Sequence, residues 1–205
     1  MKISTNGLLL IKSVIHLASL GTLLYLWYLI DQDLLGADPV KEMIHFLGKT
    51  GLNYLFLTLT ITPLAKYFKQ SLLIRTRRLL GLYCFFWTCL HLTIFLWLEL
   101  NWEFALFIDE VIKRPYLSLG AVTWIILLLL SITSITALKK KMKKAWFTLH
   151  HFVYLAVFLA VVHYYWSVKS GLTEPIIYFI ICLLLLVARR SYFKSLLLSF
   201  KRPGR

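Results

Sequence analysis

Histidine is the residue type in this sequence that is best suited to carry chemistry. The chain has six histidines, and His45 precedes an apolar stretch. The other five lie inside such stretches: His16, His91, His150, His151 and His163. Neutral imidazole is a good axial ligand for haem iron, and apolar and aromatic side chains suit the haem macrocycle. The histidines therefore predict a haem b site between facing helices.

The other reactive groups favour no competing chemistry. Cys84, Cys89 and Cys182 lie in apolar stretches without a C-x-x-C pair, so we expect them to pack as small apolar residues. The nine acidic residues lie between the apolar stretches or at their ends, which argues against an ion or proton transporter. No G-x-G-x-x-G nucleotide motif is present, so a redox function requires a separate electron donor.

The elements that must position the histidines are transmembrane helices. Hydrophobic residues make up 60% of the 205 residues, and the mean hydropathy is +0.75, as in membrane proteins. A helix needs about 20 apolar residues to cross a bilayer. Six runs approach this length: 8–30, 52–68, 79–100, 116–138, 145–168 and 175–190. We therefore expect an all-α, six-span bundle forming one domain over residues 1–205.

The longest connection between predicted spans contains a helix start. Asp38 is a good N-cap, and Pro39 suits the first helical position. We expect a short helix there that leads through Gly48 and Gly51 into the second span.

The distribution of charge orients the predicted spans. With six spans, both termini and the connections at 66–78 and 139–144 lie on one side, which holds 18 of the 23 basic residues. All nine acidic residues lie on the other side. The positive-inside rule therefore places both termini in the cytoplasm. Most of these cations are explained as topology signals and lipid contacts.

Depth in the membrane selects one histidine pair. The third and fifth predicted spans both run outward, His91 lies 8 residues before Glu99, and His163 lies 6 residues before Lys169. These two separations differ by two residues, which is about 3 Å along a helix. We therefore predict that His91 and His163 bind one haem iron in the outer half of the membrane.

A second, inner redox site is predicted near His150. This residue lies 13 positions before His163, or about 20 Å along a helix. Its side chain would point about 140° away from that of His163 on an ideal helix. The residue 14 positions before His91 is Arg77, so the third span offers no second ligand. His16 is a candidate ligand from the first span, whereas His151 is expected to give local support.

Several motifs together resemble a known family. They are GADPVKEMIHFLGKTGL, ITPLAKY, LLIRTRRLLGLYCFFWTCLH, KRPYLSLG, LHHFVYL and HYYWSVK, and they extend over nearly the whole chain. This set is similar to the MsrQ (YedZ) family of haem-binding membrane subunits, within the ferric-reductase-like transmembrane proteins that include the membrane part of NADPH oxidases. The family's important histidines match His91, His150 and His163.

The resemblance implies a function, cofactors and partners. It implies a bacterial inner-membrane subunit that passes electrons to MsrP, a periplasmic molybdoenzyme that reduces methionine sulfoxide in oxidised proteins. It also implies FMN beside haem b, with Arg75, Arg77 or Arg78 as candidates to bind the FMN phosphate or a haem propionate. The number of haems, one or two, stays open, and so does the donor, a cytosolic flavin reductase or a quinol.

These expectations combine into one mechanism. Electrons enter near His150, pass to a haem bound by His91 and His163, and leave to a partner on the outer face. The chain is then an electron-transfer subunit without substrate chemistry of its own and with no nucleic-acid partner. The alternative is the membrane part of a ferric reductase or oxidase that uses a separate flavin reductase. A transporter is the weaker alternative.

Overall fold

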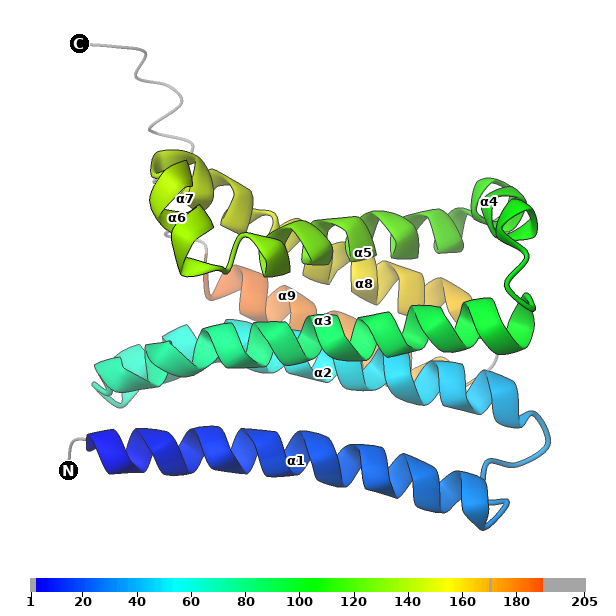
Figure 1. Cartoon of the computed structure of the whole chain (residues 1–205), viewed down its shortest axis with the longest axis horizontal. Coiled ribbons are helices and arrows are strands. Elements are labelled where there is room, and N and C mark those ends of the chain that lie inside the picture. Colours follow the sequence, from blue (N-terminus) through cyan, green and yellow to red (C-terminus); the bar gives the residue numbers. More distant parts are fainter. Residues whose placement is uncertain (1–2, 170, 190–205) are drawn as a thin grey trace.

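The chain folds into a bundle of helices (Figure 1). The computed structural model describes residues 3–169 and 171–189, and all regular secondary structure in that part is helical, as predicted. The elements are α1 (Thr5–Asp31), α2 (Pro39–Tyr67), the 3-10 helix η1 (Ser71–Thr76), α3 (Arg77–Ile94), the π-helix η2 (Phe95–Glu99), α4 (Phe104–Lys113), α5 (Pro115–Ile132), α6 (Thr136–Met142), α7 (Lys144–His151), α8 (Val153–Ser167) and α9 (Thr173–Val187).

The bundle has the composition of a membrane protein. Four helical segments are long and apolar enough to cross a membrane: Thr5–Asp31, Ser71–Glu99, Pro115–Ile132 and Lys144–Ser167. α9 is a shorter apolar helix, and α2 is long but more polar. The all-α transmembrane bundle is thus confirmed, whereas the count of six spans and the cytoplasmic termini stay predictions. Residue 190, the end of the sixth predicted span, and most of the basic tail lie outside the described residues.

Two predicted spans differ from the observed helices. The fourth, 116–138, ends at Ile132, and the lysines that follow belong to the separate helix α6. The fifth, 145–168, is divided at Phe152 into α7 and α8. Lys143 separates α6 from α7 with a φ of +50°. Cations are costly in hydrocarbon, so a turn here keeps the lysines near water.

α2 corrects one expectation about local structure. Asp38 caps the helix by accepting a hydrogen bond from the Lys41 amide, and Pro39 is the first helical residue, as predicted. The expected short helix is wrong, because α2 continues without a break to Tyr67. Gly48 and Gly51 lie inside it, where they allow α3 to approach closely. Close packing offsets the low helix propensity of glycine.

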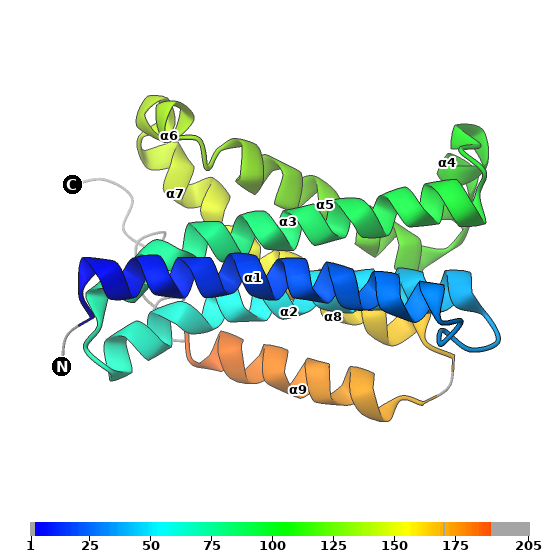
Figure 2. The same ribbon diagram turned by 60° about the horizontal axis from the view of Figure 1, so that its bottom comes forward.

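Two helix pairs form the centre of the bundle. α2 packs along α3, α5 packs along α8, and α9 covers α8 and α2. α1 lies along the outside of α2 and α3, while α4 and the α6–α7 pair lie at opposite ends (Figures 1 and 2). The inner face of α8 is fully buried at Ala156, Val157 and Val161. Both pairs therefore present one face to a shared interior.

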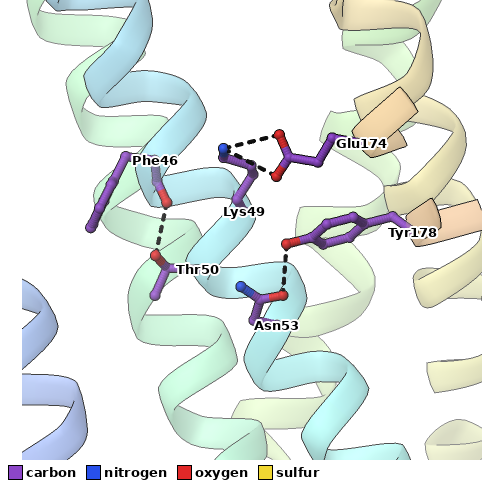
Figure 3. A network of polar contacts seen from close by, with 6 residues as sticks. All are labelled: Phe46, Lys49, Thr50, Asn53, Glu174 and Tyr178. Carbon is purple, nitrogen blue, oxygen red and sulfur yellow. Dashed lines mark hydrogen bonds and ion pairs between the residues drawn. The ribbon is translucent and has the colours of Figure 1, made fainter. Parts of the chain in front are cut away.

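Polar contacts connect α9 to α2 (Figure 3). Lys49 forms an ion pair with Glu174 at 3.2 Å, and the Tyr178 hydroxyl donates to Asn53 Oδ1 at 2.9 Å. Thr50 donates instead to the Phe46 carbonyl of its own helix. The Lys49 and Glu174 side chains are about one third and one half exposed, so the pair contributes little to stability by itself. Together the two contacts place the first part of α9 beside the stretch of α2 that carries Lys49 and Asn53.

Trp87 of α3 makes a buried contact with α1. It is 0% exposed, and its Nε1 donates to Ser19 Oγ of α1 at 3.0 Å. Truncating a fully buried aromatic side chain usually costs about 3–5 kcal/mol. Trp87→Ala should therefore lower the unfolding temperature in detergent, measured with a thiol-reactive dye that detects exposure of the buried Cys84 and Cys182.

Trp97→Ala is the matched control, because Trp97 is 53% exposed. We expect it to leave the unfolding temperature nearly unchanged. Equal unfolding temperatures for the two variants would show that Trp87 does not hold α1 in place.

Candidate functional site

His91 of α3 and His163 of α8 face each other in the interior of the bundle. Their ring centroids are 6.2 Å apart, and the ring planes are nearly perpendicular, at 83°. The structure therefore brings together the pair that depth in the membrane selected. Imidazole–metal bonds are about 2 Å long, so two imidazoles on opposite sides of one metal have ring centroids about 6 Å apart. The observed separation fits such a site.

A backbone carbonyl holds each of the two rings. His91 Nδ1 lies 2.9 Å from the Ile44 carbonyl oxygen of α2, and His163 Nδ1 lies 2.7 Å from that of Tyr116 of α5. A carbonyl oxygen only accepts, so Nδ1 donates in both residues. Nε2 of each ring then keeps its lone pair. This tautomer is the one that can bind a metal through Nε2.

Glycine makes room for both rings. Gly48 and Gly120 lie one helical turn after Ile44 and Tyr116. A Cβ at Gly48 would lie 3.1 Å from His91 Nδ1, and one at Gly120 would lie 2.9 Å from His163 Cε1. The second distance is shorter than real Cβ contacts allow, so a larger residue at position 120 must displace the ring. Sequence reasoning missed this role of both glycines.

The two histidine sites repeat the same local geometry. Each histidine lies 47 residues after its carbonyl partner. In sequence, L-G at 47–48 and at 119–120 supplies both glycines. The α2–α3 pair and the α5–α8 pair are thus related by a shift of 72 residues, from 44 to 116 and from 91 to 163. Too few residues are shared for this repeat to be found in the sequence alone.

A cavity of about 620 Å³ surrounds the two rings. Cavities that bind cofactors and other small molecules usually measure about 300–1,000 Å³. Its walls are mainly apolar and include Leu52, Leu55, Leu127, Phe95 and Phe107. No group of three or more His, Cys, Asp or Glu side chains suited to a metal ion is found in the described part of the chain. The volume of the cavity and its apolar walls fit an apolar, iron-bearing macrocycle.

Charged side chains surround the mouth of this cavity. The residues are Asp38, Lys41, Lys49, Glu99, Arg114 and Lys169. Arg114 pairs with Glu110, and its pKa is raised chiefly by the hydrogen bond to the Tyr116 hydroxyl. Four of these six residues are basic, although Lys49 and Arg114 already pair with Glu174 and Glu110. The predicted propionate contacts Arg75, Arg77 and Arg78 do not line the cavity.

His150 lies outside this cavity, at the end of the bundle that carries α6 and α7. Its Nε2 is 3.1 Å from Thr133 Oγ1, and its ring stacks on Trp146 at 3.9 Å between centroids. Thr133 Oγ1 donates to the Leu129 carbonyl, so it accepts from His150. The proton of His150 is therefore on Nε2, and Nδ1 is the nitrogen left for another partner.

His16, the predicted inner ligand from the first span, lies apart from His150. The Nδ1 of His16 is 2.6 Å from the Tyr83 hydroxyl, and the α1 helix that carries it lies on the far side of α2 and α3 from α7 (Figure 1). The structure does not bring His16 and His150 together. The His151 ring stacks parallel to that of Tyr154 at 6.5 Å, which agrees with a local role.

Arg77 is the predicted arginine that lies closest to a defined site. Its Nε is buried without a hydrogen-bond partner among the described residues, whereas Arg75 and Arg78 are exposed. Arg77 is near enough to His150 and to Arg189 to interact with both electrostatically. Arg189 donates to the Leu59 carbonyl at 3.0 Å. This end of the bundle thus holds two neighbouring guanidinium groups.

Comparison with known proteins identifies the family. The family model described as ferric reductase like transmembrane component matches residues 44–161, more than half of the chain. The match includes Ile44 and Tyr116, whose carbonyls accept from the two histidines. It also includes His91 and His150, and it ends two residues before His163. No solved structure matches the chain. The sequence match and the helical transmembrane fold agree, and the chain belongs to the ferric reductase-like transmembrane family.

Proposed function

We propose that this chain is the haem b subunit of a bacterial inner-membrane electron-transfer system. One observation carries the proposal: His91 and His163 face each other. The Nδ1–H of each ring donates to a backbone carbonyl, so Nε2 is left for a ligand. When bound, haem supplies one-electron transfer. His91 and His163 would hold and orient it, and the apolar walls of the cavity would exclude water. Membership of the ferric reductase-like family supports an electron-transfer role.

The inner end of the bundle is proposed as the place where electrons enter. Arg77 has a buried Nε without a partner in the described structure, and Arg189 lies near it. Guanidinium groups suit a phosphate, such as that of the FMN implied by the resemblance. His150 lies beside Arg77 and is the proposed residue of this redox step. A cytosolic flavin reductase or a quinol then supplies the electrons.

The proposed acceptor is a periplasmic molybdoenzyme of the MsrP type that reduces methionine sulfoxide in oxidised proteins. The support is the similarity of the motifs, including KRPYLSLG, which contains Tyr116 and Gly120, and HYYWSVK, which begins at His163. In this scheme the chain has no substrate chemistry of its own. It provides the path between the donor and the molybdoenzyme.

A ferric reductase or oxidase that uses a separate flavin reductase is the second candidate, and the family match favours it equally. The two candidates differ in the electron acceptor. Reduced chain in nanodiscs should be oxidised quickly by the molybdoenzyme and slowly by a ferric chelate or oxygen. Faster oxidation by the chelate or by oxygen would favour the second candidate.

Removal of either predicted ligand should abolish low-spin haem. His91→Ala and His163→Ala are each expected to lose most of the Soret absorbance per protein, because one imidazole cannot complete the axial pair. His45→Ala is the matched control, since His45 lines the same cavity but is assigned no ligand role. Full haem content in either ligand variant, measured as pyridine haemochrome per protein, would contradict the pairing.

The glycines predict a graded loss of haem. Gly120→Ala should reduce haem content more than Gly48→Ala, because its Cβ approaches the ring more closely. Gly21→Ala is the control, since nothing lies within 4 Å of a Cβ there. Haem content and the unfolding temperature of the apoprotein are measured together. Equal haem content in all three variants would show that the glycines do not position the histidines.

Arg77 is predicted to bind the FMN phosphate. Arg77→Gln should lower the FMN content of the purified chain several-fold, because it removes the guanidinium with the buried Nε. Arg75→Gln is the control, since Arg75 is exposed. FMN is released by acid and quantified by its fluorescence. A similar FMN content in the two variants would remove Arg77 from the proposed site.

A further inference from the structure

α4 is a short helix that none of the proposed electron-transfer steps uses. It begins at Phe104, five residues after η2 ends at Glu99, and it ends at Lys113, two residues before α5 begins. In Figure 1 α4 is seen nearly end-on, whereas the long helices run across the picture, and Figure 2 also places it at the end of the bundle. The short connections fix α4 at the level where α3 and α5 reach the end of the bundle.

One side of α4 covers the cavity. Phe107 and Val111, one turn apart, line the cavity, and the Phe107 ring lies 6.4 Å from that of Phe95. The Ser118 hydroxyl of α5 donates to the Val111 carbonyl at 2.5 Å. α4 is therefore attached to α5 and forms part of the cavity wall.

A second apolar stripe on α4 points away from the protein. Phe104, Ile108 and Ile112 follow one another at intervals of four residues, and they are 60%, 58% and 74% exposed. At 100° per residue they form one stripe next to the side that bears Phe107 and Val111. Asp109 and Lys113 lie on another side, paired with each other at 2.6 Å. α4 is thus amphipathic, with an apolar stripe that the protein leaves uncovered.

The surroundings of this stripe fit lipid. Trp97 and Trp102, at the adjoining end of the α3–η2 segment, are 53% and 47% exposed, and the Trp102 ring lies 6.3 Å from that of Phe104. Tryptophan is enriched at the boundary between lipid and water. α4 also connects the segments α3–η2 and α5, which are long and apolar enough to cross a membrane and which expose apolar side chains. The stripe therefore continues the lipid-facing surface of the bundle.

We propose that α4 lies in the membrane interface, with Phe104, Ile108 and Ile112 in lipid and with Lys113 and Asp109 toward water. Interfacial amphipathic helices bury an apolar face of this kind between headgroups and acyl chains. Lipid on one side of α4 then keeps Phe107 and Val111 over the cavity on the other. This inference is independent of the electron donor and acceptor, and of whether haem is bound.

Spin labels at neighbouring positions test the proposal. Ile108→Cys, Ile112→Cys and Lys113→Cys are labelled with a nitroxide in the full chain, which is placed in phosphatidylethanolamine and phosphatidylglycerol nanodiscs without any partner. Collisions with oxygen, which enters lipid, are compared with collisions with a water-soluble nickel chelate. The unsubstituted chain gives the background of the native cysteines, and unfolding temperatures show that the variants are folded.

The expected result is a contrast between adjacent residues. Labels at 108 and 112 should collide several-fold more with oxygen than with nickel, and the label at 113 should show the reverse preference. Nickel accessibility at 108 and 112 equal to that at 113 would overturn the proposal, because the stripe would face water. Protection of 108 and 112 from both reagents would also overturn it, because the stripe would then be covered by protein, such as a second copy of the chain.

Discussion

Two hydrogen bonds between an imidazole and a helix carbonyl determine how the centre of this protein is built. In each, a histidine Nδ1 donates to a carbonyl of the neighbouring helix, Ile44 for His91 and Tyr116 for His163. A helical carbonyl also accepts from the amide four residues later, which here belongs to Gly48 or Gly120. The absence of a Cβ at that residue lets the ring reach the carbonyl. The tautomer of each histidine follows from this contact, because Nδ1 must carry the proton.

The remainder of the bundle is arranged around these two hydrogen bonds. The α2–α3 and α5–α8 pairs each supply one histidine and one carbonyl, so the cavity forms where the two pairs meet. At one end α4 covers the cavity, and charged residues surround its mouth. At the other end, His150 and Arg77 belong to a separate polar region without a second opposed histidine among the described residues. The described structure thus brings one pair of histidines together, and His150 lies apart from that pair.

The sequence predicted much of this arrangement, and the parts that it missed have physical reasons. Hydropathy and charge indicated a helical membrane bundle, and depth relative to Glu99 and Lys169 paired His91 with His163. Depth gives the position of a residue along a helix, but not the direction in which its side chain points. Depth therefore could not show whether His16 lies near His150. The roles of Gly48 and Gly120 depend on contacts between helices distant in sequence. Helix ends such as Ile132 were missed because an apolar run does not reveal where the backbone turns.

The most direct test of the histidine pair is the electron paramagnetic resonance spectrum of the purified ferric protein. Two neutral imidazoles on one iron give a low-spin signal, and nearly perpendicular ring planes, as in the 83° observed here, make it strongly anisotropic. The account predicts this signal in the wild-type chain. A predominantly high-spin spectrum would contradict axial binding by both histidines, and a rhombic low-spin spectrum would contradict the perpendicular orientation that the two carbonyls impose.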